Sequence, residues 1–139
     1  MTHKELEEKR AKEFEEWKEK LITDNPHVFA GGYPYCGFDL PYGWKVLLQT
    51  LVEKIESYIS SNQRFEHVPN EISIHQIKEK FAGLRVYISG ANEFVFGMID
   101  MAETYSYKIC QECGQYGKIY TDCGWDRTLC EKCHDKFIK

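Results

Sequence analysis

The spacing of apolar residues along the chain predicts three helices. Residues 2–22 carry a narrow apolar stripe at helical intervals, and Thr2 with Glu5 forms a capping-box pattern at their start. A broader stripe over 43–60 predicts the main helix of the core, and a third stripe over 91–106 runs directly into a cysteine-rich segment. The narrow stripe of the first helix suits packing on its own domain, or contact with a second copy of the chain or a partner protein.

Between the second and third helices, residues 72–89 predict at least one strand. Leu84, Val86 and Ile88 alternate with polar residues, as in a strand with one buried face. Residues 74–81 fit either a helix, because their apolar residues are three and four apart, or a second strand that pairs with the first. In both cases we expect an α+β fold with three main helices and a small β-sheet.

Residues 25–43 predict an irregular loop, because they contain three of the four prolines and four of the ten glycines. They also contain five Phe and Tyr side chains, so the loop either covers the core or forms a binding surface. The chain thus divides into a charged N-terminal helix over 1–25, an α+β body over 26–107 and a cysteine-containing module over 108–139. We expect this module to pack on the body through Trp125.

The cysteine spacing predicts one structural zinc site. Two C-x2-C pairs are separated by 16 residues, within the range of four-cysteine zinc sites. Four thiolates close the coordination sphere of one Zn²⁺ and leave no position for water or substrate. The predicted ligands are Cys110, Cys113, Cys130 and Cys133, while Cys123 and His134 are spare donors, either of which could replace one of the four.

The residues around these cysteines predict a treble clef, in which a tight turn, a hairpin and a helix surround the metal. Gly114 suits the tight turn because glycine readily adopts a positive φ. Residues 118–125 predict the hairpin. Thr128 with Glu131 forms a capping pattern for a C-terminal helix over 130–138.

Charge disfavours a general nucleic-acid-binding protein. The net charge is −4, and four thiolates holding one divalent ion would bring it to about −6, whereas nucleic-acid binding usually needs a basic face. The alternative function is nonetheless a nucleic-acid-binding zinc finger. Its contacts would come from the cations of the last segment, namely Lys108, Lys118, Arg127, Lys132, Lys136 and Lys139.

No apolar run approaches the ~20 residues that cross a bilayer, and the charged N-terminus predicts a cytoplasmic protein with no membrane partner. The sequence contains no nucleotide-binding glycine loop, deaminase motif or esterase-type serine motif. None of the five histidines lies at a local spacing typical of a catalytic site. A non-enzymatic binding protein is therefore expected, although distant residues could still assemble a catalytic site in the folded chain.

A short cationic stretch is the candidate ligand site. Its cations could bind a phosphate or carboxylate, and aromatic rings of the loop could stack on a planar group. The alternative is that these cations pair with neighbouring carboxylates on a solvated surface. The candidate site comprises Lys78, Lys80, Arg85 and Tyr87 with Tyr33, Tyr35 and Trp44, and its expected ligand is small and anionic, such as a nucleotide.

Two segments carry a resemblance to a known family. The segment IKEKFAGLRVY at 77–87 and the pattern CQECG...GWDRTLCEKC at 110–133 resemble short, functionally uncharacterised proteins of bacteria and their phages. That family shares a KEKFGxLRFY-like segment followed by a zinc finger; here Ala82 and Val86 stand where Gly and Phe are frequent. The resemblance covers about 42–133. The family lends no established activity. We expect a phage- or prophage-type accessory protein that engages a host protein or sequesters a small ligand, because residues 26–44 are rich in aromatic side chains, the first helix has a narrow apolar stripe and catalytic motifs are missing.

Overall fold

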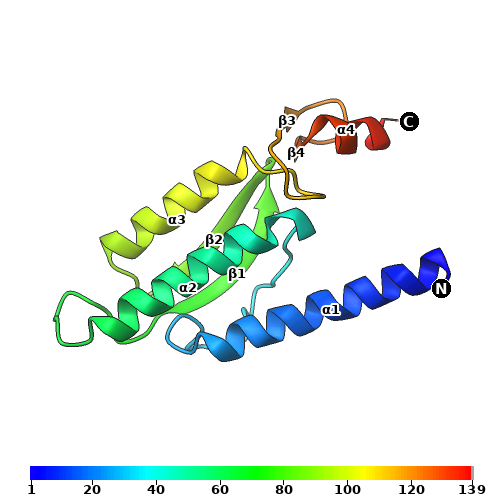
Figure 1. The fold of residues 1–139 in the computed structure, drawn as a ribbon. Coiled ribbons are helices and arrows are strands. Elements are labelled where there is room, and N and C mark those ends of the chain that lie inside the picture. Colours follow the sequence, from blue (N-terminus) through cyan, green and yellow to red (C-terminus); the bar gives the residue numbers. More distant parts are fainter. Residues whose placement is uncertain (139) are drawn as a thin grey trace.

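The computed structural model describes residues 1–138 and confirms the α+β class (Figure 1). Within these residues it contains four α-helices, a 3-10 helix and two separate two-stranded antiparallel sheets, and none of the helices is long and apolar enough to cross a bilayer. In chain order the elements are α1 (His3–Asp24), η1 (Tyr42–Trp44), α2 (Lys45–Ser61), β1 (Ser73–Lys80), β2 (Gly83–Ser89), α3 (Glu93–Ser106), β3 (Lys118–Tyr120), β4 (Arg127–Leu129) and α4 (Glu131–Phe137).

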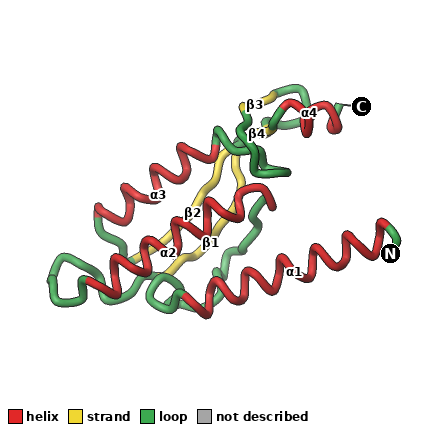
Figure 2. The backbone as a smooth tube through the Cα atoms, viewed as in Figure 1, coloured by secondary structure: helices red, strands yellow, loops and turns green. Residues whose placement is uncertain are grey.

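The body is built from helices packed on one hairpin. α2 and α3 lie side by side over the β1–β2 hairpin, and α1 runs beside the loop that precedes α2 (Figures 1 and 2). The C-terminal module lies where α3 ends and α2 begins. A buried apolar core joins these layers, and its largest fully buried side chains include Trp44, Leu48, Ile55, Ile59, Ile77 and Leu84.

α1 begins with the predicted capping box. The Thr2 hydroxyl accepts a hydrogen bond from the Glu5 N–H at 3.1 Å, and the Glu5 carboxylate accepts one from the Thr2 N–H at 3.2 Å. The apolar stripe is buried only in the second half of the helix, since Leu6 is half exposed. That half also buries a cation that the stripe does not predict: the Lys18 ammonium donates to the Phe38 carbonyl at 2.8 Å.

Residues 73–80 form a strand. Of the helix and the strand that the sequence allows over 74–81, the strand is therefore the structure observed. β1 pairs antiparallel with β2 and places Ile77 opposite Val86. The pairing shifts just after Ile74, where His75 is inserted as a β-bulge. Because of this extra residue, Ile74 and Ile77 are both buried although they are three positions apart. The bulge therefore produces an apolar spacing that resembles a helix.

The turn between β1 and β2 holds two residues in an unfavourable backbone conformation. Lys80 pairs with Gly83, so Phe81 and Ala82 are the two central residues of a tight hairpin turn. Their φ angles are 52° and 72°, the pattern of a type I′ turn, which strongly prefers Asn-Gly. Neither residue is a glycine, so the turn is strained.

Phe81→Asn is expected to stabilise the protein by about 0.5–1 kcal/mol, because Asn tolerates a positive φ and the Phe81 ring is 71% exposed and loses little packing. Urea unfolding measures the change. Tyr116→Asn is the matched control, since Tyr116 is 77% exposed but does not have a positive φ. An equal gain in the control, or no gain at Phe81, would show that turn strain is not the cause.

The loop over 25–43 covers the free edge of β1. Phe29 forms a bridge with Ser73 and Phe38 forms one with Ile77, and both Phe side chains are buried. For this part of the loop, the interpretation as a cover over the core is confirmed.

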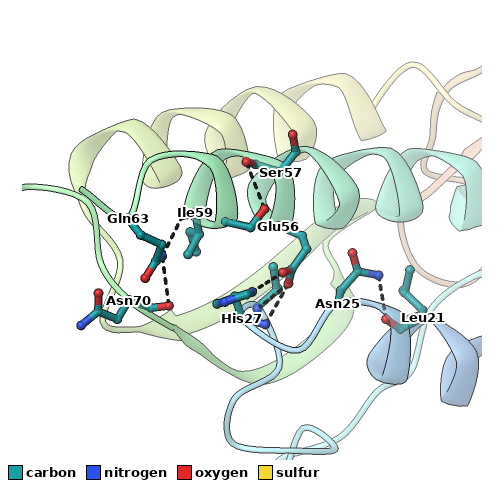
Figure 3. Close-up of polar contacts among 10 residues, drawn as sticks. Leu21, Asn25, His27, Glu56, Ser57, Ile59, Gln63 and Asn70 are labelled. Atoms are coloured by element: carbon teal, nitrogen blue, oxygen red, sulfur yellow. Dashed lines mark hydrogen bonds and ion pairs between the residues drawn. The ribbon is translucent and has the colours of Figure 1, made fainter. Parts of the chain in front are cut away.

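A carboxylate of α2 fixes the start of this loop (Figure 3). Glu56 accepts hydrogen bonds from the backbone N–H groups of His27 at 2.8 Å and Val28 at 3.2 Å, and it also contacts the His27 ring. Just before these residues, the Asn25 side chain donates to the Leu21 carbonyl at 2.8 Å. The end of α1 is thereby tied to the middle of α2.

Side chains of α3 cover the free edge of β2. The Ser106 hydroxyl accepts a hydrogen bond from the Leu84 N–H, and the Glu103 carboxylate accepts one from the Val86 N–H, both at 2.9 Å. Burial raises the pKa of Glu103, and the hydrogen bond from Val86 partly offsets this effect. Both outer edges of the hairpin are therefore occupied by the chain itself, which blocks pairing with another strand.

The C-terminal module contacts the body through Gly43 and Trp44. The Trp44 side chain is completely buried, and its indole N–H donates to the Ile109 carbonyl at 2.8 Å. A Cβ atom at Gly43 would lie 2.0 Å from the Cys110 carbonyl oxygen, so only glycine fits there. Trp125 is 63% exposed, and its predicted role as the anchor is wrong.

Candidate metal centre

The first cysteine pair lies in a tight turn that follows α3. The Cys110 N–H donates to the Gln115 carbonyl at 2.7 Å, and the Gly114 N–H donates to the Cys110 carbonyl at 3.0 Å. Gly114 has φ of +83°, a conformation that favours glycine. An isolated bridge between Ile109 and Tyr116 closes the turn. The tight turn expected at this position is therefore present.

The second pair lies at the start of α4. Cys130 is the N-cap residue, and its Sγ accepts a hydrogen bond from the Cys133 N–H at 3.5 Å. The sequence predicts the cap at Thr128, but this residue lies in β4 and the helix begins at Glu131. The prediction of the helix is correct and the prediction of its cap is wrong, because a thiol occupies the position that usually holds a hydroxyl or a carboxylate.

The four predicted ligands converge at one point. Their sulfur atoms all lie within 4.8 Å of one another. The sulfurs of Cys113 and Cys130 are 3.6 Å apart, close to the ~3.8 Å that two Zn–S bonds of ~2.3 Å span at a tetrahedral angle. Cys110 and Cys133 are buried. The donor set and its spacing therefore fit one tetrahedral Zn²⁺.

The environment of the thiols prepares one of them for ionisation. Burial raises the pKa of Cys133, and its contacts with the other three thiols raise it further. Burial acts in the same direction on Cys130, but hydrogen bonds from the backbone and side chain of Cys133 outweigh it and lower the pKa of Cys130 to about 7. A metal ion needs thiolates as ligands, and the Cys130 thiolate forms readily at neutral pH.

Cys123 and His134 lie outside the four-cysteine cluster. Within residues 1–138 they group with Asp122 instead, and the donor atoms of these three side chains lie within 4.8 Å of one another. The ligand set of the centre is therefore complete without either spare donor.

Two buried polar residues hold the module in place: Gln111, which the sequence analysis does not single out, and Thr128, to which it assigns a different role. The side-chain oxygen of Gln111 accepts a hydrogen bond from the backbone N–H of Thr128 at 2.6 Å. The backbone N–H of Gln111 donates to the Thr128 carbonyl at 2.9 Å. The Thr128 hydroxyl donates to the Ala82 carbonyl at 2.8 Å, at the tip of the β1–β2 hairpin. No pattern in the sequence distinguishes Gln111 from an exposed residue between two cysteines.

The aromatic residues of the predicted ligand site do not line one pocket. Trp44 is completely buried in the core and cannot reach a ligand from solvent. Tyr33 is half exposed and lies 6.0 Å from the Phe38 ring, while Tyr35 lies 5.0 Å from the His75 ring. Of the aromatic residues proposed from the loop and the start of α2, only the two tyrosines therefore remain available for stacking.

The cations of that site lie on the hairpin. Lys78 faces Arg85 across the two strands. Lys80 lies two residues after Lys78 on β1, Tyr87 lies two residues after Arg85 on β2, and both are exposed. The Arg85 guanidinium is partly engaged within the chain, since it donates to the Tyr107 hydroxyl at 2.8 Å. The cations are thus brought together on one face of the hairpin.

Two of the cations proposed for nucleic-acid contact are also engaged. The Arg127 guanidinium lies between two aromatic rings, 4.6 Å from the centre of Trp125 and 4.4 Å from that of Phe137. Lys118 similarly lies 5.1 Å from the Tyr120 ring. These contacts use two of the six cations for packing inside the module.

No family model, curated protein or solved structure matches this chain. The fold and the site themselves define a class. The chain is an α+β protein with a C-terminal four-cysteine centre that could bind a metal ion.

Proposed function

We propose that the protein is a non-enzymatic binding module whose treble-clef zinc finger stabilises a body that engages a partner protein. The zinc is structural, because four cysteine ligands leave no open coordination position. None of the six cysteines forms a disulfide, which suits the reducing cytoplasm. The resemblance to phage and bacterial proteins supports an accessory role in which the partner is a host protein.

The observation that carries this proposal is an apolar groove between α2 and α3. It encloses about 620 Å³ and adjoins a second hollow of about 600 Å³ that reaches the zinc finger. Leu47, Thr50 and Tyr105 line both. Phe94 and Met101 line the first and are 54% and 70% exposed. Exposed apolar surface that is continuous in this way is typical of an interaction site.

The groove suits an amphipathic helix of the partner. A helix can bury one apolar face between two neighbouring helices, with anchors at positions i, i+3, i+4 and i+7. Gly97 leaves room for it, since a Cβ atom there would meet nothing within 4 Å. Met98 and Met101 supply flexible side chains that adapt to such a face, while Lys54 and Glu93 offer charges of both signs.

The alternative function, nucleic-acid binding, has less support. The chain is acidic, and two cations of the finger pack on aromatic rings of the same module. Sequestration of a small anion at the cationic hairpin face also has less support, because Trp44 is unavailable for stacking.

A photo-crosslinking residue at Met101 of the full-length protein is expected to form an adduct with one protein of the host lysate, identified by mass spectrometry. The same photo-crosslinking residue at position 60 should form no adduct, because Ser60 is exposed on α2 but does not line the groove. Phe94→Asp should abolish the adduct at position 101, because a charge in the groove opposes burial of an apolar helix.

Equal adducts at positions 101 and 60 would contradict the groove as the binding site. Binding to DNA that weakens steeply between ~50 and ~200 mM salt would instead support the nucleic-acid alternative, since that dependence reports phosphate contacts.

A further inference from the structure

A second group of side chains that could bind a metal ion lies between the β3–β4 turn and α4, apart from the four cysteines. Asp122 and Cys123 belong to the turn between β3 and β4, and His134 belongs to α4. His134 Nε2 lies 2.9 Å from both Asp122 oxygens, and Cys123 Sγ lies 3.6 Å from Asp122 Oδ1. Ligand atoms at ~2.0–2.3 Å from a tetrahedral ion are ~3.3–3.8 Å apart. The separation of Cys123 and Asp122 lies within this range, whereas that of His134 and Asp122 is a hydrogen-bond distance, which would lengthen by ~0.4 Å on metal binding.

The histidine of this group is held as a metal ligand usually is. Its side chain is only 11% exposed, and its ring stacks on Tyr120 with centroids 3.7 Å apart and an interplanar angle of 12°. The other ring nitrogen, Nδ1, lies 3.4 Å from Asp135 Oδ1. A metal-bound histidine almost always turns its second nitrogen toward such an acceptor, which fixes the orientation of the ring.

A hydrogen bond between Asp122 and His134 would by itself tie the hairpin turn to α4. That structural role needs no thiol, yet the half-buried Cys123 directs its Sγ at the same carboxylate. The convergence of an oxygen, a sulfur and a nitrogen donor from two separate elements is what a metal ion would use.

We propose that Asp122, Cys123 and His134 bind a second divalent transition-metal ion, separate from the structural zinc. A thiolate and an imidazole favour Zn²⁺ or Co²⁺ over Mg²⁺ or Ca²⁺. Three protein ligands leave a fourth position open, as in catalytic rather than structural zinc sites. The Asp122 side chain is 56% exposed, so water can reach this position. On binding, Cys123 releases its proton to solvent and His134 keeps its ring proton on Nδ1, facing Asp135.

Cobalt titration of the full-length, folded and reduced protein, with the metal ion left in its four-cysteine centre, tests the proposal. Visible absorption and a competing chelator should show one Co²⁺ ion per chain beside that resident ion. Cys123→Ser, Asp122→Asn and His134→Gln should each weaken cobalt binding at least about 10-fold and leave one resident ion per chain by elemental analysis. Cys36→Ser removes an exposed thiol elsewhere in the chain and should bind cobalt with the original affinity.

If the folded native protein, with its four-cysteine centre loaded, binds no Co²⁺ at saturating cobalt, the proposal is overturned. Cobalt binding of unchanged affinity in Cys123→Ser would also overturn it. Circular dichroism establishes the fold of each variant, and Cys123→Ser, which changes one atom, keeps the test decisive even where His134→Gln does not fold.

Discussion

Serine in place of Cys110 or Cys133 is expected to leave the protein unfolded or insoluble under conditions in which the native chain is folded. Both thiols are buried at the four-cysteine centre. The site does not exist in the unfolded chain, so the free energy of metal binding is also free energy of folding. In isolated zinc fingers it amounts to ~10–16 kcal/mol, comparable with the whole stability of a typical domain, ~5–15 kcal/mol.

Elemental analysis and thermal unfolding by circular dichroism measure this effect. Each variant should lose the metal ion of the four-cysteine centre and its cooperative unfolding transition. Cys36→Ser is the control, since this thiol is exposed and lies outside the centre. If the variant with serine at all four ligand positions keeps the native melting temperature, the metal does not hold the fold together.

Trp44→Ala is expected to destabilise the protein by about 3–5 kcal/mol, the range for truncating a large buried aromatic residue. It removes the largest side chain at the junction and the hydrogen bond to the Ile109 carbonyl. Trp44→Phe keeps most of the apolar volume but leaves that carbonyl without its partner, at a cost of about 1–3 kcal/mol.

Trp125→Ala is the matched control, because Trp125 is 63% exposed. In urea, the free energy of unfolding of this variant should fall by no more than about 1 kcal/mol, because the substitution removes only the contact of an exposed ring with Arg127. Equal losses at the two tryptophans would mean that the finger is held through Trp125 after all.

The elements with a strong local signal could be predicted from the sequence. The capping box of α1 depends only on Thr2 and Glu5, and the metal centre depends on cysteine spacing, because each pair must fit one turn of backbone. The strand β1 could not be predicted with the same clarity. Its bulge at His75 breaks the alternation of buried residues that identifies a strand.

Tertiary contacts account for the other differences. Two tryptophans beside glycines look alike in the sequence, and only the packed structure shows that Trp44 is buried and Trp125 is exposed. Cys123 and His134 stand out as donors, but their partner Asp122 carries no local signal, since an acidic residue in a turn is ordinary. The buried ammonium of Lys18 depends on a carbonyl twenty residues away.

The unsupported first turns of α1 have a consequence for its motions. Residues 3–13 are all exposed, and in that stretch the Arg10 guanidinium contacts the body by lying 3.8 Å over the Tyr42 ring. An isolated helical end of this length is marginal in water, so amide hydrogens near His3 should exchange within minutes while those near Leu21 stay protected. If α1 mediates self-association, the amide hydrogens near His3 should exchange more slowly as the protein concentration rises.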